Sequence, residues 1–161
     1  MELPTVTITR EPTLSPNSLL LIDDEPHVLA VGKAILSSQG FSVICATSGE
    51  QALDLIRHAH SIGKSYAAAL LDLTMPGGAS GFDVLEMIRA VNTDLPVIAC
   101  SGYFQEDARE LCQAIGFYDI LSKPFHIETL AITVRRAING EAAPRSVAAP
   151  AFASAPITQW G

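Results

Sequence analysis

Polar side chains of three chemical kinds follow four short apolar runs of this sequence. Asp23 and Asp24 follow the run SLLLI, and Asp72 follows AAALL. Ser101 follows PVIAC, and Lys123 follows DILS. If these runs are parallel strands of one sheet, their ends lie along a single edge, where open α/β sheets place their ligand sites. Three carboxylates, a hydroxyl and an ammonium group would then share one pocket.

Such a pocket could form an aspartyl phosphate with the help of a metal ion. Three adjacent carboxylates need positive charge to stay ionised, and a ligand set made only of oxygen favours Mg²⁺ over zinc. A carboxylate can attack a phosphoryl group once the charge on that group is neutralised. Asp72, alone at the end of its run, is the best candidate nucleophile, while Asp23 and Asp24 can divide the metal between them. Lys123 and Ser101 would each contact a phosphoryl oxygen.

Strand-like and helix-like patterns alternate five times between residues 18 and 139. The expected strands are 18–22, 41–46, 66–71, 95–100 and 118–121, and the expected helices are 26–38, one that opens at Thr47 or Ser48, 82–91, 105–115 and 126–138. Because crossovers between parallel strands are right-handed, this alternation predicts an α/β fold, a three-layer αβα sandwich. The expected strand order is the flavodoxin-like 2-1-3-4-5, which puts the two strands that end in Asp at the centre.

Composition divides the 161-residue chain into one domain and two tails. Residues 1–17 form an expected flexible tail, 18–139 the domain, and 140–161 an Ala- and Pro-rich tail that we expect to be disordered. A net charge of −7 argues against direct nucleic-acid binding, and no apolar run reaches the roughly 18 residues of a membrane span. The N-terminus lacks a signal-peptide pattern, so the cytoplasm is the expected location.

Residues 18–139 resemble the receiver domain of two-component response regulators. The motifs IDDEP, LDLTMPGG, ACSG and LSKPF occur in the order and approximate spacing of that family. The resemblance implies that Asp72 accepts a phosphoryl group from the phosphohistidine of a sensor histidine kinase or a histidine phosphotransfer protein. It also implies that the backbone carbonyl of Thr74 joins Asp23, Asp24 and Asp72 around Mg²⁺. Ser101 would move towards the phosphoryl group.

Two further expectations follow from the resemblance. The Lys-Pro bond of the family is typically cis, so Lys123–Pro124 is expected in that isomer. Three positions before the Lys, the family usually has a Tyr or Phe that swings inward with the switch hydroxyl, whereas this chain has Ile120. An aliphatic side chain can fill the space that Ser101 vacates, but it has no phenolic hydrogen bond to lose. Output through the fourth helix, fifth strand and fifth helix, including a dimer through that face, is therefore left open.

The predicted function is that of a single-domain receiver, a signalling phosphoprotein that assists only its own phosphorylation and dephosphorylation. It would signal through phosphorylation-dependent binding of a partner protein, or act as a phosphate sink. Its motifs look most like those of receivers attached to hybrid sensor kinases. The alternative is a receiver-shaped scaffold with altered or lost switching, and Ile120 is the only feature of the sequence that favours it.

Plainer interpretations of the same residues were weighed against these. Asp23, Asp24 and Asp72 could simply cap the helices that follow, since strand-to-helix loops favour Asp. A small-molecule phosphatase or phosphotransferase of another α/β family is disfavoured, because Thr74 stands where haloacid-dehalogenase-type enzymes have a second Asp. Trp160 in the second tail is either part of a short docking motif or an incidental residue, and the incidental interpretation is favoured.

Overall fold

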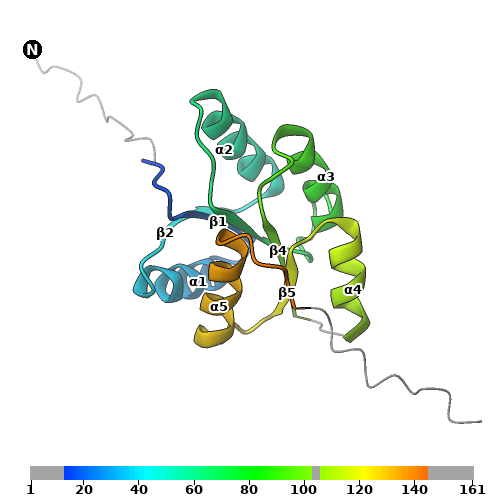
Figure 1. Cartoon of the computed structure of the whole chain (residues 1–161). Helices are drawn as coiled ribbons and strands as arrows, with labels where there is room; N and C mark the ends of the chain where they lie inside the picture. Colours follow the sequence, from blue (N-terminus) through cyan, green and yellow to red (C-terminus); the bar gives the residue numbers. More distant parts are fainter. Residues whose placement is uncertain (1–12, 103–105, 145–161) are drawn as a thin grey trace, which may run out of the picture.

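Five runs rich in Leu, Ile, Val and Ala form one parallel sheet in the computed structural model, which describes residues 13–102 and 106–144 (Figure 1). The strands are β1 (Ser18–Ile22), β2 (Ser42–Ala46), β3 (Ala68–Asp72), β4 (Val97–Ser101) and β5 (Asp119–Ser122). Their order is β2-β1-β3-β4-β5, as predicted. The strands β1, β3 and β4 are buried along their whole length, because helices cover both faces of a parallel sheet.

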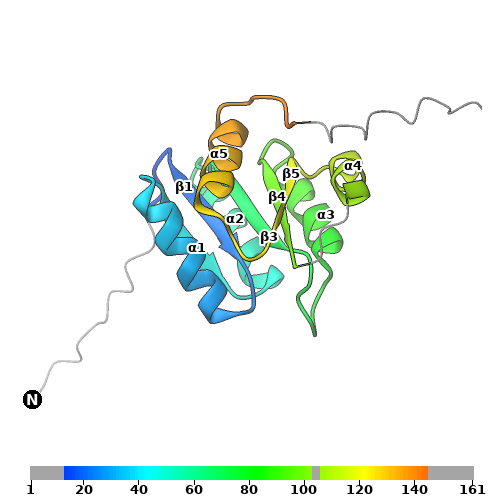
Figure 2. The ribbon, with the colours of Figure 1, turned by 90° about the horizontal axis from the view of Figure 1, so that it is seen from below.

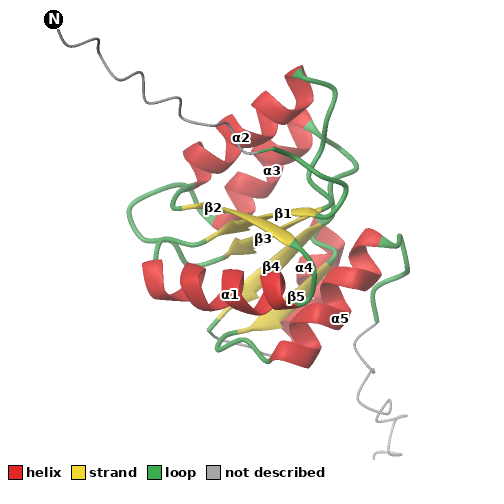
Figure 3. Cartoon of the chain, turned by 90° about the vertical axis from the view of Figure 1, so that its left-hand side faces the viewer, coloured by secondary structure: helices red, strands yellow, loops and turns green. Residues whose placement is uncertain are grey.

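Each strand leads into a helix on one of the two faces. The helices are α1 (Pro26–Ser38), α2 (Gly49–Ser61), α3 (Gly81–Val91), α4 (Glu106–Ile115) and α5 (Ile127–Ile138). Helices α1 and α5 lie on one side of the sheet and α2 and α3 on the other (Figure 3), and α4 packs into the same core as α2 and α3. The predicted αβα sandwich is confirmed. Residue 105, the expected first residue of the fourth helix, lies outside the described residues.

Successive side chains along each strand point alternately into two hydrophobic cores, one on each face of the sheet. In β1, Leu19 and Leu21 point towards α1 and α5, whereas Leu20 and Ile22 point towards α2, α3 and α4. This follows from the two-residue period of a strand, whose successive side chains lie on opposite faces. Within the described part of the chain, no helix combines the length and the apolar character that a membrane crossing requires.

Side-chain caps determine where two of the helices begin. The amide of Gln51 donates to the hydroxyl of Ser48 at 3.1 Å, so Ser48 rather than Thr47 is the N-cap of α2. Helix α3 begins with a full capping box, in which Ser80 and Asp83 each accept a backbone amide of the other. This box was not among the features predicted from the sequence.

Residues assigned to the expected N-terminal tail contact the domain where the structure describes them. Leu14 is buried in the core on the α2 side of the sheet. The backbone amide of Ser18 donates to the carbonyl of Ser15 at 3.0 Å. Residues 1–12 lie outside the described residues, so the tail boundary itself stays a prediction.

The chain beyond α5 turns towards α4 (Figure 2). The hydroxyl of Tyr118 donates to the carbonyl of Glu141 at 2.7 Å, and Nε2 of Gln113 on α4 donates to the carbonyl of Pro144 at 3.2 Å. Residues 141–144 therefore contact the domain, although the sequence analysis assigned them to the C-terminal tail. The rest of that tail, including Trp160, lies outside the described residues.

A buried ion pair joins α4 to β5. Nε of Arg109 lies 2.9 Å from Oδ1 of Asp119, and the amide of Ile120 donates to the same oxygen at 2.8 Å. Burial raises the pKa of Asp119 above its ordinary value, although the Ile120 amide and the Arg109 guanidinium both oppose that shift. The guanidinium therefore compensates a carboxylate that water cannot reach.

Close packing at Gly81 positions the loop between β3 and α3. A Cβ at Gly81 would lie 2.9 Å from the Cα of Leu73 and 3.2 Å from the backbone oxygen of Asp72. Real Cβ atoms essentially never come so close to backbone, so a larger residue would displace the chain just after β3. In the same loop, a Cβ at Gly78 would meet nothing within 4 Å.

Gly81→Ala is expected to lower the free energy of unfolding by about 1–3 kcal/mol, because the backbone of Leu73 must move to admit the methyl group. The matched variant Gly78→Ala should change that free energy by no more than about 0.5 kcal/mol. Urea unfolding at neutral pH measures both. If both variants lost the same free energy of unfolding, the close approach at Gly81 would not be the cause of the loss.

Arg109→Met is expected to lower the free energy of unfolding at pH 7 by about 2–4 kcal/mol, because it leaves the Asp119 carboxylate buried without its cation. In this variant the folded-state pKa of Asp119 rises further above the unfolded value. The deficit should therefore be present at neutral pH and shrink as the pH falls from that raised pKa towards the unfolded value, below which Asp119 is neutral in both states.

Urea unfolding of wild type and variant between pH 7 and pH 4 provides the measurement. The double variant Arg109→Met/Asp119→Asn is the control, and its deficit should depend less on pH. A deficit in Arg109→Met that stays constant across this range would contradict the ion-pair explanation.

Candidate functional site

The register of the sheet brings the carboxyl ends of its strands to one edge. Ile22 pairs with Leu71, Asp72 pairs with Cys100, and Ser101 pairs with Ser122. Residues at or just after these ends must therefore be neighbours, whatever their separation in the sequence. The predicted convergence of polar side chains is what this register produces.

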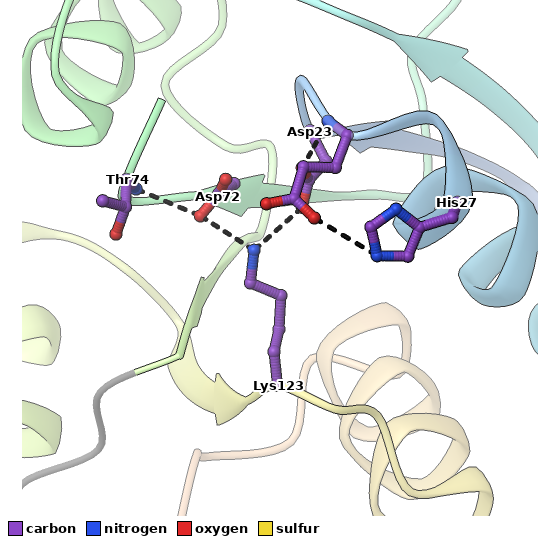
Figure 4. Close-up of polar contacts among 6 residues, drawn as sticks. Asp23, His27, Asp72, Thr74 and Lys123 are labelled. Atoms are coloured by element: carbon purple, nitrogen blue, oxygen red, sulfur yellow. Dashed lines mark hydrogen bonds and ion pairs between the residues drawn. The ribbon is translucent and has the colours of Figure 1, made fainter. Parts of the chain in front are cut away.

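Lys123 lies between two carboxylates at this edge (Figure 4). Its Nζ donates to Oδ2 of Asp23 at 3.0 Å and lies 3.2 Å from Oδ1 of Asp72. The backbone holds both carboxylates in place: the amide of Glu25 donates to Oδ1 of Asp23 at 2.9 Å, and the amide of Thr74 donates to Oδ1 of Asp72 at 3.0 Å. Each carboxylate is thus oriented by the loop that follows its own strand.

Burial makes these charges depend on one another. Asp23 and Asp72 are each 2% exposed. Burial raises the pKa of Asp72, and the charge of Asp23 adds to the rise, while the Thr74 amide and the Lys123 ammonium oppose it. For Lys123, burial alone would lower the pKa, but the hydrogen bond to Asp23 and the charges of both aspartates outweigh it, so its pKa is raised. Lys123 is therefore held in its charged form.

A third carboxylate makes the group suitable for a divalent cation. One oxygen each from Asp23, Asp24 and Asp72 lie within 4.8 Å of one another. With Lys123 as the neighbouring cation, three ionised carboxylates leave two negative charges uncompensated at this edge. The donor set is entirely oxygen, which is the coordination that Mg²⁺ prefers. The residues present therefore fit such an ion in both charge and chemistry.

A pocket of about 400 Å³ opens beside this acidic group. Its lining comes from the loops that follow four strands and from the start of α1: Glu25, His27, Val28, Thr74, Gly102, Lys123 and Pro124. The Lys123–Pro124 peptide bond is cis. A narrower, apolar groove of about 130 Å³ continues along α1 and is lined by His27, Val28, Val31, Lys123, Pro124 and Phe125. The acidic group can thus be reached from solvent past an apolar surface.

Ser101 ends β4 at the same edge, where it is buried. Its carbonyl accepts the amide of Lys123 at 2.8 Å, which joins the end of β4 to the residue after β5. Thr74 lies at the pocket, and its amide is engaged with Asp72. The expected roles of the Ser101 hydroxyl and of the Thr74 carbonyl stay predictions.

Ile120 lies away from the pocket, buried in the core between the sheet and helices α2, α3 and α4. The nearby aromatic residues have other partners. Phe117 packs edge-to-face against Phe82 with ring centroids 6.0 Å apart, and Tyr118 donates its hydroxyl to Glu141. Neither ring takes the place of an aromatic residue at position 120.

The sequence analysis missed the ion pair that neighbours Ile120. Arg109 and Asp119 are ten positions apart with no motif between them, so their spacing carried no signal. The one available clue was an acidic residue at the start of an expected strand, since a carboxylate in a buried strand needs a partner. Only the packing of α4 against β5 identifies that partner.

Comparisons with known proteins agree with this geometry. The family model of the response regulator receiver domain matches residues 19–135. The transcriptional regulatory protein CpxR of Escherichia coli strain K12 is 36% identical over 119 residues, which cover 74% of this chain and 48% of CpxR. The cell cycle transcriptional regulator CtrA of Caulobacter vibrioides strain NA1000 / CB15N is 34% identical over 110 residues, which cover 67% of this chain and 44% of CtrA. The chain thus spans less than half the length of these two curated relatives.

Solved structures show the same fold. The crystal structure of a response regulator receiver domain protein from Clostridium thermocellum matches with a TM-score of 0.66 at 29% identity, covering 76% of this chain and 94% of that one. The solution structure of the beryllofluoride-activated NtrC4 receiver domain dimer matches with a TM-score of 0.68 at 26% identity, covering 77% and 98%. Since the family match runs from β1 into α5 and thus includes every strand end that builds the pocket, the chain belongs to the response regulator receiver domain family.

Proposed function

We propose that Asp72 accepts a phosphoryl group from the phosphohistidine of a sensor histidine kinase or a histidine phosphotransfer protein. The observation that carries this proposal is the position of Asp72, a buried carboxylate at the pocket with the ammonium of Lys123 only 3.2 Å away. A carboxylate so placed can attack phosphorus, because the neighbouring cation offsets the charge that accumulates on the transferring group. The chain then acts as a phosphoprotein of a two-component phosphorelay.

Mg²⁺ is the proposed cofactor of this transfer. Asp23, Asp24 and Asp72 would hold it together with the backbone carbonyl of Thr74, a set supported by the closeness of the three carboxylates. When bound, the ion supplies positive charge to the phosphoryl oxygens. The neighbouring protein groups would contribute further contacts. Lys123 would donate to one phosphoryl oxygen, and the hydroxyl of Ser101 would donate to another.

The phosphodonor would approach along α1. The apolar groove beside the pocket exposes Val28, Val31 and Phe125 within reach of the site, and Pro124 forms part of its wall. An apolar surface next to a charged pocket suits a transient protein contact, because it gives affinity without competing for the phosphoryl group. We therefore place the donor protein over α1 and the loop between β5 and α5.

Output would pass through a protein partner, or the chain would serve as a phosphate sink. A dimer through the α4–β5–α5 face is one form that the partner contact could take. We propose that this signalling takes place in the cytoplasm, without direct nucleic-acid contact, and that the chain's only catalysis is of its own phosphorylation and dephosphorylation.

Incubation with Mg²⁺ and acetyl phosphate should add one phosphoryl group, which intact-mass spectrometry detects. Asp72→Asn should remove the uptake, since an amide cannot form the acyl phosphate. The matched variant Asp54→Asn, on the exposed side of α2, should keep it. Chelation of the metal with EDTA should also prevent uptake. If neither acetyl phosphate nor any histidine kinase adds this mass to the wild type, the proposed function is wrong.

The second candidate is a receiver-shaped scaffold with altered or lost switching. One observation favours it, because the aliphatic Ile120 is packed in the core at the position where the family usually has an aromatic switch residue. In that case phosphorylation would proceed without a structural response.

Hydrogen exchange of the chain with and without phosphorylation separates the two candidates. We expect phosphorylation to change the exchange of amides in α4 and β5, because Ser101 ends β4 at the pocket, pairs with Ser122 of β5 and precedes α4 in the chain. Asp72→Asn treated with the same donor is the control and should show no change. Identical exchange of the phosphorylated and unphosphorylated wild type would favour the scaffold.

A further inference from the structure

A groove whose lining mixes charged and large apolar side chains lies between α3 and α4, away from the residues that line the phosphoryl pocket. It has a volume of about 390 Å³ and is lined by Phe82, Asp83, Leu85, Glu86, Arg89 and Ile115. Phe82 is 40% exposed and Ile115 46%, and Leu111, one turn before Ile115 on α4, is 59% exposed. Side chains of this size are usually covered when they gather on one surface.

Two side chains that line the groove are held in place by other parts of the chain. The ring of Phe82 is held edge-on against the buried ring of Phe117, with centroids 6.0 Å apart. Arg89 is held by its own contacts, since its NH2 nitrogen donates to the carbonyl of Gly116 at 3.0 Å. Because these two side chains of the α3 wall are already held in the folded chain, little of their freedom is lost when something binds beside them.

The end of the described chain lies on the same helix. The side chain of Gln113 on α4 donates to the carbonyl of Pro144, and the hydroxyl of Tyr118 donates to the carbonyl of Glu141. The chain is therefore directed from α5 onto α4 and reaches that helix only two positions from Ile115. Residues 145–161 continue from this point.

The composition of residues 145–161 suits the groove. Arg145 is their only charged side chain, whereas the α3 wall of the groove carries two carboxylates, Asp83 and Glu86, against one guanidinium, Arg89, and is therefore acidic on balance. Phe152 and Trp160 are the aromatic residues of this segment. The segment can thus offer a basic group to the acidic wall and a large ring to the apolar floor.

Distance does not prevent the contact. An extended chain covers at most about 3.3–3.6 Å per residue, and a helix with its side chains is roughly 10–12 Å across. The sixteen positions from Pro144 to Trp160 are therefore more than long enough to cross α4. A tethered segment also has an effective concentration near the millimolar range, so even a weak intrinsic affinity is enough to occupy the site.

We propose that residues 145–161 cross α4 and place Trp160 in the α3–α4 groove of the same chain. The segment then covers the exposed side chains of Ile115 and Phe82. A protein partner that uses this groove must displace it, so the C-terminal segment acts as an intramolecular competitor for the α3–α4 surface.

Fluorescence of the full chain tests the proposal, because Trp160 is its only tryptophan. The emission of the folded chain should lie at shorter wavelength than that of a synthetic peptide of residues 145–161. Its quenching by acrylamide should be several-fold weaker. Ile115→Gln should restore peptide-like emission and quenching. The matched variant Ile62→Gln changes an isoleucine that is 51% exposed at the end of α2, and it should leave both signals as in wild type.

Three outcomes would overturn the proposal. Peptide-like emission from the wild-type chain would leave the groove free for another protein. Shielded emission that Ile115→Gln does not change would place Trp160 elsewhere. Shielding that disappears on dilution, with dimers seen in sedimentation velocity, would assign the groove to the segment of a second copy. No phosphodonor is needed, so the result is independent of the proposed function.

Discussion

The contact of one ammonium with two buried carboxylates is the interaction on which the site depends. Lys123 lies 3.0 Å from Asp23 and 3.2 Å from Asp72, and all three side chains are largely removed from water. Without that cation, burial would favour the protonated form of Asp72, and a protonated aspartate is a poor nucleophile. With it, and with Asp24 adding a third carboxylate, the edge keeps an excess of negative charge that suits a divalent ion.

The sheet and its loops fix the positions of these charged side chains. Five parallel strands with helices on both faces leave only the strand ends and their loops to carry polar groups, because the strand interiors are buried. The loops are themselves held by the backbone. Thr74 donates its amide to Asp72, and Gly81 allows α3 to begin close against the chain that follows β3. The Asp72 carboxylate therefore sits at the end of a buried strand and is oriented by a tightly packed loop.

A different kind of contact dominates the α4 side of the molecule. Arg109 and Asp119 join α4 to β5 beside Ile120, and the chain beyond α5 is held to the same elements through Tyr118 and Gln113. A family position that usually carries an aromatic ring is here a packed aliphatic residue with a buried ion pair next to it. Changes at the pocket would thus reach α4 through charge and packing rather than through a phenolic hydrogen bond.

The sequence by itself determined the local structure and the chemistry: apolar periodicity predicted all five strands and helices, and the residues after four strands predicted the polar set of Asp23, Asp72 and Lys123 with its neighbours. The polar set could be predicted because the carboxyl ends of parallel strands lie along the same edge of the sheet. Only the tertiary structure decided which distant groups meet without a motif. The pair of Arg109 and Asp119 and the contact of Pro144 with α4 depend on how helices pack across the sheet, and no local period encodes such packing.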